Sequence, residues 1–150
     1  MEHKVLVGID CSPNAERAVD YVGTLLRVHD QARITLHHVL TAPSADILPD
    51  GHKRRRALEE RRERALRQLE AMAQRLVERG IPRDRIRLQV QECEKGEGIA
   101  RLLLEEQRRG GYQTVVVGRR GMSKREEFLF GSVSSKIVRE ARNCTVWVVQ

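Results

Sequence analysis

Short apolar runs alternate with longer stretches of helical periodicity along this chain of 150 residues. The first run, residues 5–9, is continuous and apolar, which is typical of a strand buried on both faces of a parallel sheet. Four further strands are predicted at residues 34–40, 86–90, 114–117 and 145–149. Residues 86–90 alternate apolar and polar side chains, which indicates a strand at or near a sheet edge.

Helical patterns occupy the intervals between these runs. Ser12 supplies a capping hydroxyl and Pro13 suits the first turn of a helix. The apolar residues of that helix recur at helical spacing: Ala15, Ala18, Val19, Val22, Leu25 and Leu26. A long charged helix is expected at about residues 53–79, ended by Gly80. Two more helices are expected from Ile99 to Gly110 and from near Ser132.

Five strands that alternate with four helices predict a doubly wound α/β fold. We expect a single domain over residues 1–150, with a five-stranded parallel sheet in the order 3-2-1-4-5 and helices on both faces. In such sheets, ligands bind beyond the carboxyl ends of the strands, where the strand order reverses. Asp10 and Gly118 follow the first and fourth strands, so both are expected beside this crevice.

The segment after the fourth strand carries the strongest candidate chemistry. Gly118 and Gly121 lie three residues apart, and Gly131-Ser132-Val133 follows after nine further residues, where a helix begins. A strand, a glycine loop and a helix start together form an anion site, because free backbone N–H groups and the positive end of the helix dipole converge there. The glycines let the backbone approach a ligand closely, so a phosphate chain is the expected ligand.

The composition of the chain indicates what kind of partner the protein binds and in which cellular compartment it is expected. Lys and Arg number 28 against 21 Asp and Glu, and the formal charge of +7 favours an anionic partner. The 3 cysteines are far apart and form no CxxC pair, which argues against a disulfide framework and for a reducing cytosol. No signal peptide and no apolar run near the ~20 residues of a membrane span is present, so we expect a cytoplasmic protein without a membrane partner.

Several familiar site patterns do not occur. The P-loop pattern GxxxxGK[ST] is missing, and the first strand–helix turn, from Gly8 to Ser12, is not a GxGxxG dinucleotide motif. His37 and His38 are adjacent on a strand and therefore point to opposite faces of the sheet. We accordingly expect no metal site built from these histidines.

The spacing Gly118-x2-Gly121-x9-Gly131-Ser132 resembles the ATP-binding signature of the universal stress protein family. The similarity covers nearly the whole chain and includes residues 5–10, 36–39 and 146–149. The resemblance implies an ATP-binding regulatory protein of the stress response, with Mg²⁺ or Mn²⁺ held through the phosphates. It also implies a homodimer, because family members commonly pair through the last strand, here the apolar edge strand 145–149.

The same resemblance assigns roles to single residues. Asp10 would contact the adenosine, and the backbone of Val39 would read the adenine edge. Gly118 and Gly121 would leave room for the ribose and the phosphates. The residues that would cradle the phosphate chain are Gly131, Ser132 and Val133.

The basic pair Arg119-Arg120 departs from the family pattern, which often has a small polar residue followed by a basic one. Two guanidiniums at this place favour phosphate electrostatically, although one of them can simply point to solvent. They are therefore included among the candidate nucleotide-binding residues.

Other interpretations stay open. Asp10 can be a helix cap only, and glycines after a strand are often turn residues. A slow ATPase or autophosphorylating enzyme is the main functional alternative, with Ser132 or Ser134 as acceptor, but no evident general base or P-loop lysine accompanies the loop. The basic residues of the long helix are interpreted as a solvated face. Nucleic acid is not an expected partner, because so few aromatic residues are present for base stacking.

Overall fold

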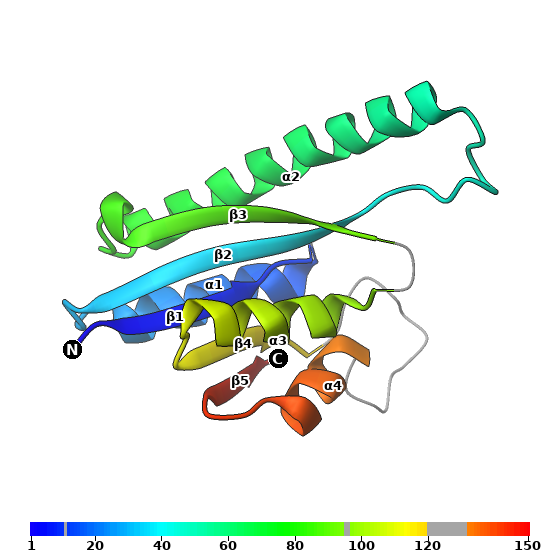
Figure 1. Ribbon diagram of the computed structural model, residues 1–150. Coiled ribbons are helices and arrows are strands. Elements are labelled where there is room, and N and C mark those ends of the chain that lie inside the picture. Colours follow the sequence, from blue (N-terminus) through cyan, green and yellow to red (C-terminus); the bar gives the residue numbers. More distant parts are fainter. Residues whose placement is uncertain (11, 95–96, 120–131) are drawn as a thin grey trace.

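The computed structural model describes residues 1–10, 12–94, 97–119 and 132–150 (Figure 1). Its strands are β1 (His3–Gly8), β2 (Ala32–Thr41), β3 (Ile86–Cys93), β4 (Thr114–Gly118) and β5 (Thr145–Val149). Its helices are α1 (Pro13–Leu26), α2 (Gly51–Glu78), α3 (Ile99–Gly110) and α4 (Ser132–Glu140), with a short 3₁₀ helix, η1, at Arg83–Arg85. No helix within these ranges is both long and apolar enough to cross a membrane.

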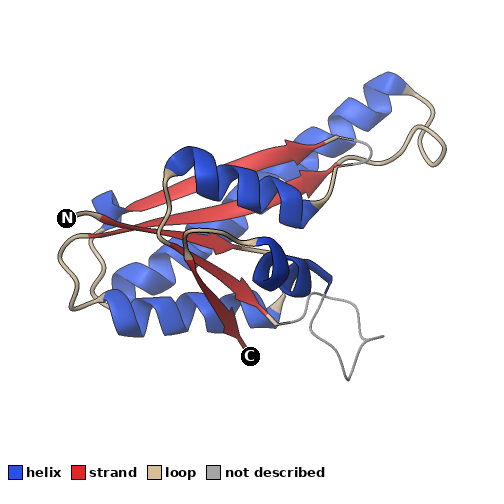
Figure 2. Cartoon of the chain, turned by 60° about the horizontal axis from the view of Figure 1, so that its bottom comes forward, coloured by secondary structure: helices blue, strands red, loops and turns tan. Residues whose placement is uncertain are grey.

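The strands are parallel and lie in the order β3-β2-β1-β4-β5, which confirms the predicted fold class. Helices pack on both sides of the sheet (Figure 2). The strand order reverses between β1 and β4, because the chain continues from β1 to β2 on one side and returns to β4 on the other. β3 is an edge strand, as its alternating residues indicated.

β2 and β3 extend beyond the carboxyl end of β1. Their pairing continues to Thr41 opposite Cys93, whereas β1 ends at Gly8, opposite His37. β3 is therefore three residues longer than the predicted strand, since Gln91, Glu92 and Cys93 keep partners in β2. The apolar pattern alone did not show this extension, because it depends on the neighbouring strand.

α1 and α2 cover one face of the sheet, which we call the back face. The strand residues on this face are apolar, among them Val5, Val7, Ile34, Leu36 and Ile86. Val19 and Val22 of α1 and Leu69 and Leu76 of α2 pack against them, and all four are fully buried. The hydrophobic effect thus holds α1 and α2 against β1, β2 and β3 on this face.

α3 and α4 cover the opposite face, called here the front face. Over β1 and β4 this face is apolar, with Leu6, Val115 and Val117 packed against Leu103 and Ile137. Over β2 and β3 it is polar. The register places Thr35 beside Arg87, His37 beside Gln89 and Val39 beside Gln91.

Buried polar groups gather on the polar part of the front face. The Tyr112 hydroxyl donates to Thr35 Oγ1 at 3.0 Å, and the Glu106 side chain pairs with Arg109. His37 is fully buried, and neither of its ring nitrogens has a hydrogen-bond partner in the described part of the chain. Burial lowers the pKa of His37, because the imidazolium loses its hydration there. The Glu106 carboxylate and the neighbouring Gln91 side chain oppose this effect only in part.

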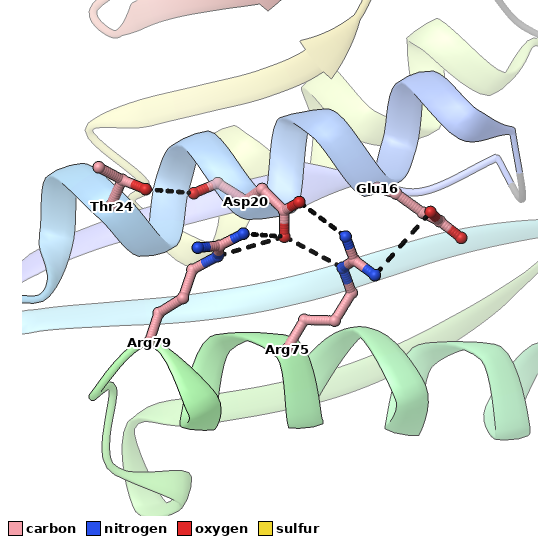
Figure 3. Close-up of polar contacts among 5 residues, drawn as sticks. All are labelled: Glu16, Asp20, Thr24, Arg75 and Arg79. Carbon is pink, nitrogen blue, oxygen red and sulfur yellow. Dashed lines mark hydrogen bonds and ion pairs between the residues drawn. The ribbon is translucent and has the colours of Figure 1, made fainter.

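An ion-pair cluster ties α1 to α2 on the solvent side of the back layer (Figure 3). The Asp20 carboxylate accepts hydrogen bonds from Arg75 Nη2 at 2.6 Å and from Arg79 Nε at 3.2 Å. These bonds, that of Arg75 above all, hold the pKa of Asp20 below its ordinary value. Glu16 lies one turn away, 3.9 Å from Arg75 Nη1.

Candidate functional site

The candidate site lies at the carboxyl ends of β1, β2 and β4, where the strand order reverses. Asp10 follows β1, Val39 lies in the extended end of β2, and Gly118 ends β4. The start of α4 brings Ser132 after the same strand. Arg120, Gly121 and Gly131 belong to the predicted site but lie outside the described residues.

The turn after β1 holds Asp10 through Ser12. Asp10 is exposed, and its Oδ1 accepts hydrogen bonds from Ser12 N at 3.0 Å and from Ser12 Oγ at 2.5 Å. The cap of α1 is Ser12, whose Oγ accepts from Ala15 N, with Pro13 in the first turn. Asp10 therefore orients the capping residue, and no described residue donates to its second oxygen, Oδ2.

Gly118 brings the end of β4 against the first turn of α1. A Cβ on Gly118 would stand 3.0 Å from Asn14 Cβ and 3.3 Å from the Asn14 carbonyl carbon. Part of this contact is backbone, which moves less easily than the end of a long side chain. Close packing against Asn14 therefore explains why glycine suits position 118, and it brings β4 near the turn that carries Asp10.

Val39 offers backbone groups rather than a side chain. Its side chain is buried, and its N–H and C=O point to the same side of β2 as those of His37, because the direction alternates along a strand. The His37 carbonyl accepts from Ile9 N at 2.8 Å, so this side faces β1. Since β1 has already ended, the Val39 peptide groups face the crevice without a ladder partner in the described sheet.

Beyond β4, the chain is fixed by backbone and hydroxyl contacts. Arg119 N donates to the Val149 carbonyl at 2.8 Å, and the buried Ser134 hydroxyl donates to the Arg119 carbonyl at 3.0 Å. Ser132 is exposed at the first residue of α4, while Val133 packs against the apolar part of the front layer. Of the two serines considered as phosphate acceptors, only Ser132 is accessible.

Sequence reasoning missed one contact of this site. His38 Nδ1 lies 2.6 Å from the carbonyl oxygen of Ile9, the residue that precedes Asp10. The adjacent histidines were considered as metal ligands and as part of the segment 36–39 that resembles the family, but not as donors to a neighbouring strand. Among the described residues, no group of three or more His, Cys, Asp or Glu side chains is arranged to hold a metal ion. No local pattern indicated that His38 contacts the first strand–helix turn, since the two residues are 29 positions apart.

A doubly wound α/β fold with a site at the reversal of strand order defines a large class of nucleotide-binding and related proteins. Within that class, the model of the universal stress protein family matches residues 1–150, and the chain belongs to this family. A universal stress protein of Mycolicibacterium smegmatis is 34% identical over 147 residues. The match covers 98% of this chain and 48% of that relative, so the chain spans about half the relative's length.

Solved structures of the family share the fold. UspA of Lactobacillus plantarum matches with a TM-score of 0.83 at 17% identity, over 99% of this chain and 97% of that one. A universal stress protein in complex with cAMP matches with a TM-score of 0.66 at 22% identity, over 99% and 97% of the two chains. An Arabidopsis thaliana family protein with AMP bound matches with a TM-score of 0.64 at 20% identity, over 98% and 90%.

Proposed function

We propose that this protein is a regulatory, cytoplasmic module of the stress response that binds ATP at the crevice between β1 and β4. The observation that carries the proposal is the Val39 backbone beside the Asp10 turn, whose N–H and C=O have no ladder partner among the described residues. A strand edge with a free N–H and C=O can pair with the edge of an adenine ring, and a nearby carboxylate can accept from a ribose hydroxyl. The AMP and cAMP held by two related structures support a nucleotide as the ligand.

In this proposal the adenosine lies at Asp10 and Val39, and the phosphates lie toward the glycine segment and the start of α4. Ser132 is exposed there, at the positive end of a nine-residue helix. Gly118, Arg119, Arg120, Gly121, Gly131 and Val133 complete the proposed binding residues. A Mg²⁺ or Mn²⁺ ion would be held mainly by the phosphates. We propose that residues 1–150 act as one domain.

Calorimetry with ATP and Mg²⁺ tests the ligand and the site together. We expect the unaltered protein to bind ATP with a Kd in the micromolar to sub-millimolar range, and Gly121→Val to abolish binding. Gly98→Val is the matched control, because a Cβ at Gly98, the residue before α3, meets no described heavy atom within 4 Å. Equal binding by the unaltered protein and by Gly121→Val would refute the site, and no binding by the unaltered protein would refute the function.

Little or no turnover is expected, because the chain lacks a P-loop lysine. The exposed Ser132 is the observation that favours the alternative, a slow autophosphorylating enzyme. Incubation with γ-labelled ATP should leave both the protein and Ser132→Ala unlabelled. Label on the unaltered protein that disappears in Ser132→Ala would establish that alternative, and steady-state hydrolysis well above one turnover per minute would establish an ATPase.

We propose a homodimer through β5. This strand is at the edge of the sheet, and four of its five residues are half-buried. A half-covered apolar edge strand has free ladder groups that a second copy can pair with. Sedimentation at micromolar concentration should give twice the monomer mass of 17.2 kDa. A sedimenting mass equal to the monomer would contradict the dimer.

A further inference from the structure

The side chain of His38 joins the two strands whose ends form the proposed adenosine site. Its Nδ1 is 2.6 Å from the Ile9 carbonyl oxygen, and the ring is half-buried. A carbonyl oxygen only accepts, so the ring nitrogen is the donor and carries the proton. The bond therefore requires either the Nδ1–H tautomer or the imidazolium, and both supply the same donor.

The bond completes a two-point attachment of the end of β1 to β2. Ile9 N donates to the His37 carbonyl at 2.8 Å, and the Ile9 carbonyl accepts from His38. The first attachment uses backbone only and is available to any residue at position 37. The second needs a side chain with a donor at the distance of Nδ1.

This second bond controls the next residue along the chain. The Ile9 carbonyl and the Asp10 N–H belong to one peptide unit, which is planar. When His38 fixes the direction of that carbonyl, it also fixes the direction in which the chain enters Asp10. The Asp10 carboxylate is then locked by Ser12, whose N and Oγ both donate to Oδ1.

His38 is also the residue directly before Val39 in β2. One side chain thus links the strand that presents the Val39 backbone with the turn that presents the Asp10 carboxylate. We propose that His38 is a positioning residue of the nucleotide site, which sets the spacing and orientation of these two groups through its bond to Ile9. The inference rests on the proposed function, because it assigns His38 to the same ATP site.

Substitutions at position 38 separate the hydrogen bond from the bulk of the ring. His38→Leu removes the donor and keeps an apolar side chain. His38→Asn places an amide N–H near the position of Nδ1, whereas His38→Gln carries its amide one bond farther from the backbone. We expect His38→Leu and His38→Gln to raise the Kd for Mg-ATP about tenfold, which corresponds to one lost hydrogen bond to a buried acceptor. His38→Asn should stay within about threefold of the unaltered protein.

His37→Leu is the matched control for these variants. His37 precedes His38 in β2, is fully buried on the front face and has no hydrogen-bond partner among the described residues. A leucine there replaces the ring by a side chain of similar size, so the Kd for ATP should not change. Rescue by His38→Asn is the result that a purely structural role of the ring would not produce, because asparagine does not replace the packing of imidazole.

A measurement without nucleotide tests the bond itself. Long-range ¹H–¹⁵N spectra of the unaltered protein should show the His38 proton on Nδ1 at neutral pH. A proton on Nε2 alone would overturn the assignment of the donor. ATP binding by His38→Leu and His38→Gln with unchanged Kd would overturn the positioning role while the proposed function stands. Weak binding by His38→Asn, equal to that of His38→Leu, would overturn the hydrogen bond as the cause. No ATP binding by the unaltered protein would overturn the positioning role together with the proposed function.

Discussion

The two faces of the sheet over β2 and β3 differ in the interactions of their buried side chains. On the back face, Ile34, Leu36 and Ile86 pack against α2, and Asp20 meets two arginines at the solvent rim of this layer. On the front face the same strands present His37 and polar side chains of β3, some of whose buried atoms have no partner in the described structure. The back face is built for stability, whereas the front face contains buried polar atoms that oppose it.

Truncation of a core side chain on the back face should lower the free energy of unfolding more than any other change considered below. Leu69 of α2 is fully buried against the sheet, so Leu69→Ala leaves a cavity and should cost about 2–5 kcal/mol of unfolding free energy. Urea denaturation measures it. Leu66→Ala, on the same helix at an exposed position, is the control and should stay within about 0.5 kcal/mol. Similar losses for both variants would mean that the back face is not the main source of stability.

Removal of the Asp20 carboxylate at the rim of the back face should lower the free energy of unfolding by a smaller amount. Asp20→Ala removes the carboxylate that Arg75 and Arg79 both contact, and we expect a loss of about 1–2 kcal/mol at neutral pH and low salt. Because the pKa of Asp20 is lowered in the folded protein, its contribution is present above the ordinary value of 3.8 and is lost as pH falls below it. Chemical denaturation at pH 7 and pH 3 should therefore show a smaller difference between protein and variant at pH 3. Asp30→Ala, at an exposed position after α1, is the control.

On the front face, removal of a buried polar side chain should not lower the stability of the protein. His37→Leu removes two buried nitrogens that have no hydrogen-bond partner among the described residues. We expect the variant to be as stable as the unaltered protein or up to about 1 kcal/mol more stable. The pKa of His37 is lowered by burial, so the unfolded chain takes up a proton first as pH falls. Stability should then decline below the ordinary histidine value of 6.5, and His37→Leu should lose that part of the decline.

Thermal unfolding of both proteins between pH 8 and pH 5 measures this difference. His29→Asn, at an exposed position, is the control and should retain the decline of the unaltered protein. A marked loss of stability in His37→Leu at pH 8 would show that the front-face histidine makes a favourable contact after all.

The smallest effect is expected for an exposed ion pair between α2 and β3. Arg62 pairs with Glu92, and the two side chains are 38% and 52% exposed. Solvent screens such a pair, so a double-mutant cycle with Arg62→Ala and Glu92→Ala should give a coupling energy of at most about 0.5–1 kcal/mol. A larger coupling would place part of the stability at this edge of the sheet rather than in the back-face core.

Much of the fold was predictable because its signals are local. The continuous apolar run of β1 and the alternating pattern of β3 indicated a central and an edge strand, and both positions are confirmed. Ser12 and Pro13 indicated the start of α1, which begins at Pro13 with Ser12 as its cap. The ends of β2 and β3 were less predictable, because the last pairs depend on the neighbouring strand rather than on apolar periodicity.

The candidate site was predictable only as a place and a set of residue types. Asp10 and Gly118 were expected beside one crevice, and the structure brings the turn after β1 and the end of β4 together there. The packing of Gly118 against Asn14 was not expected, because glycine also permits turns and close ligand approach. The role of Val39 was implied by family resemblance. The register supplied a physical basis for it, because β2 extends beyond the carboxyl end of β1.

The sequence by itself determined the order of strands and helices, the Ser12 cap of α1 and the family, because these follow from neighbouring residues and from spacing along the chain. Only the tertiary structure decided which of two adjacent histidines is buried without a partner in the described part of the chain, and which donates to Ile9. It alone placed Asp20 between two arginines more than 50 positions away. Such contacts join distant segments, and their geometry is set by how the strands and helices pack, which no local pattern encodes.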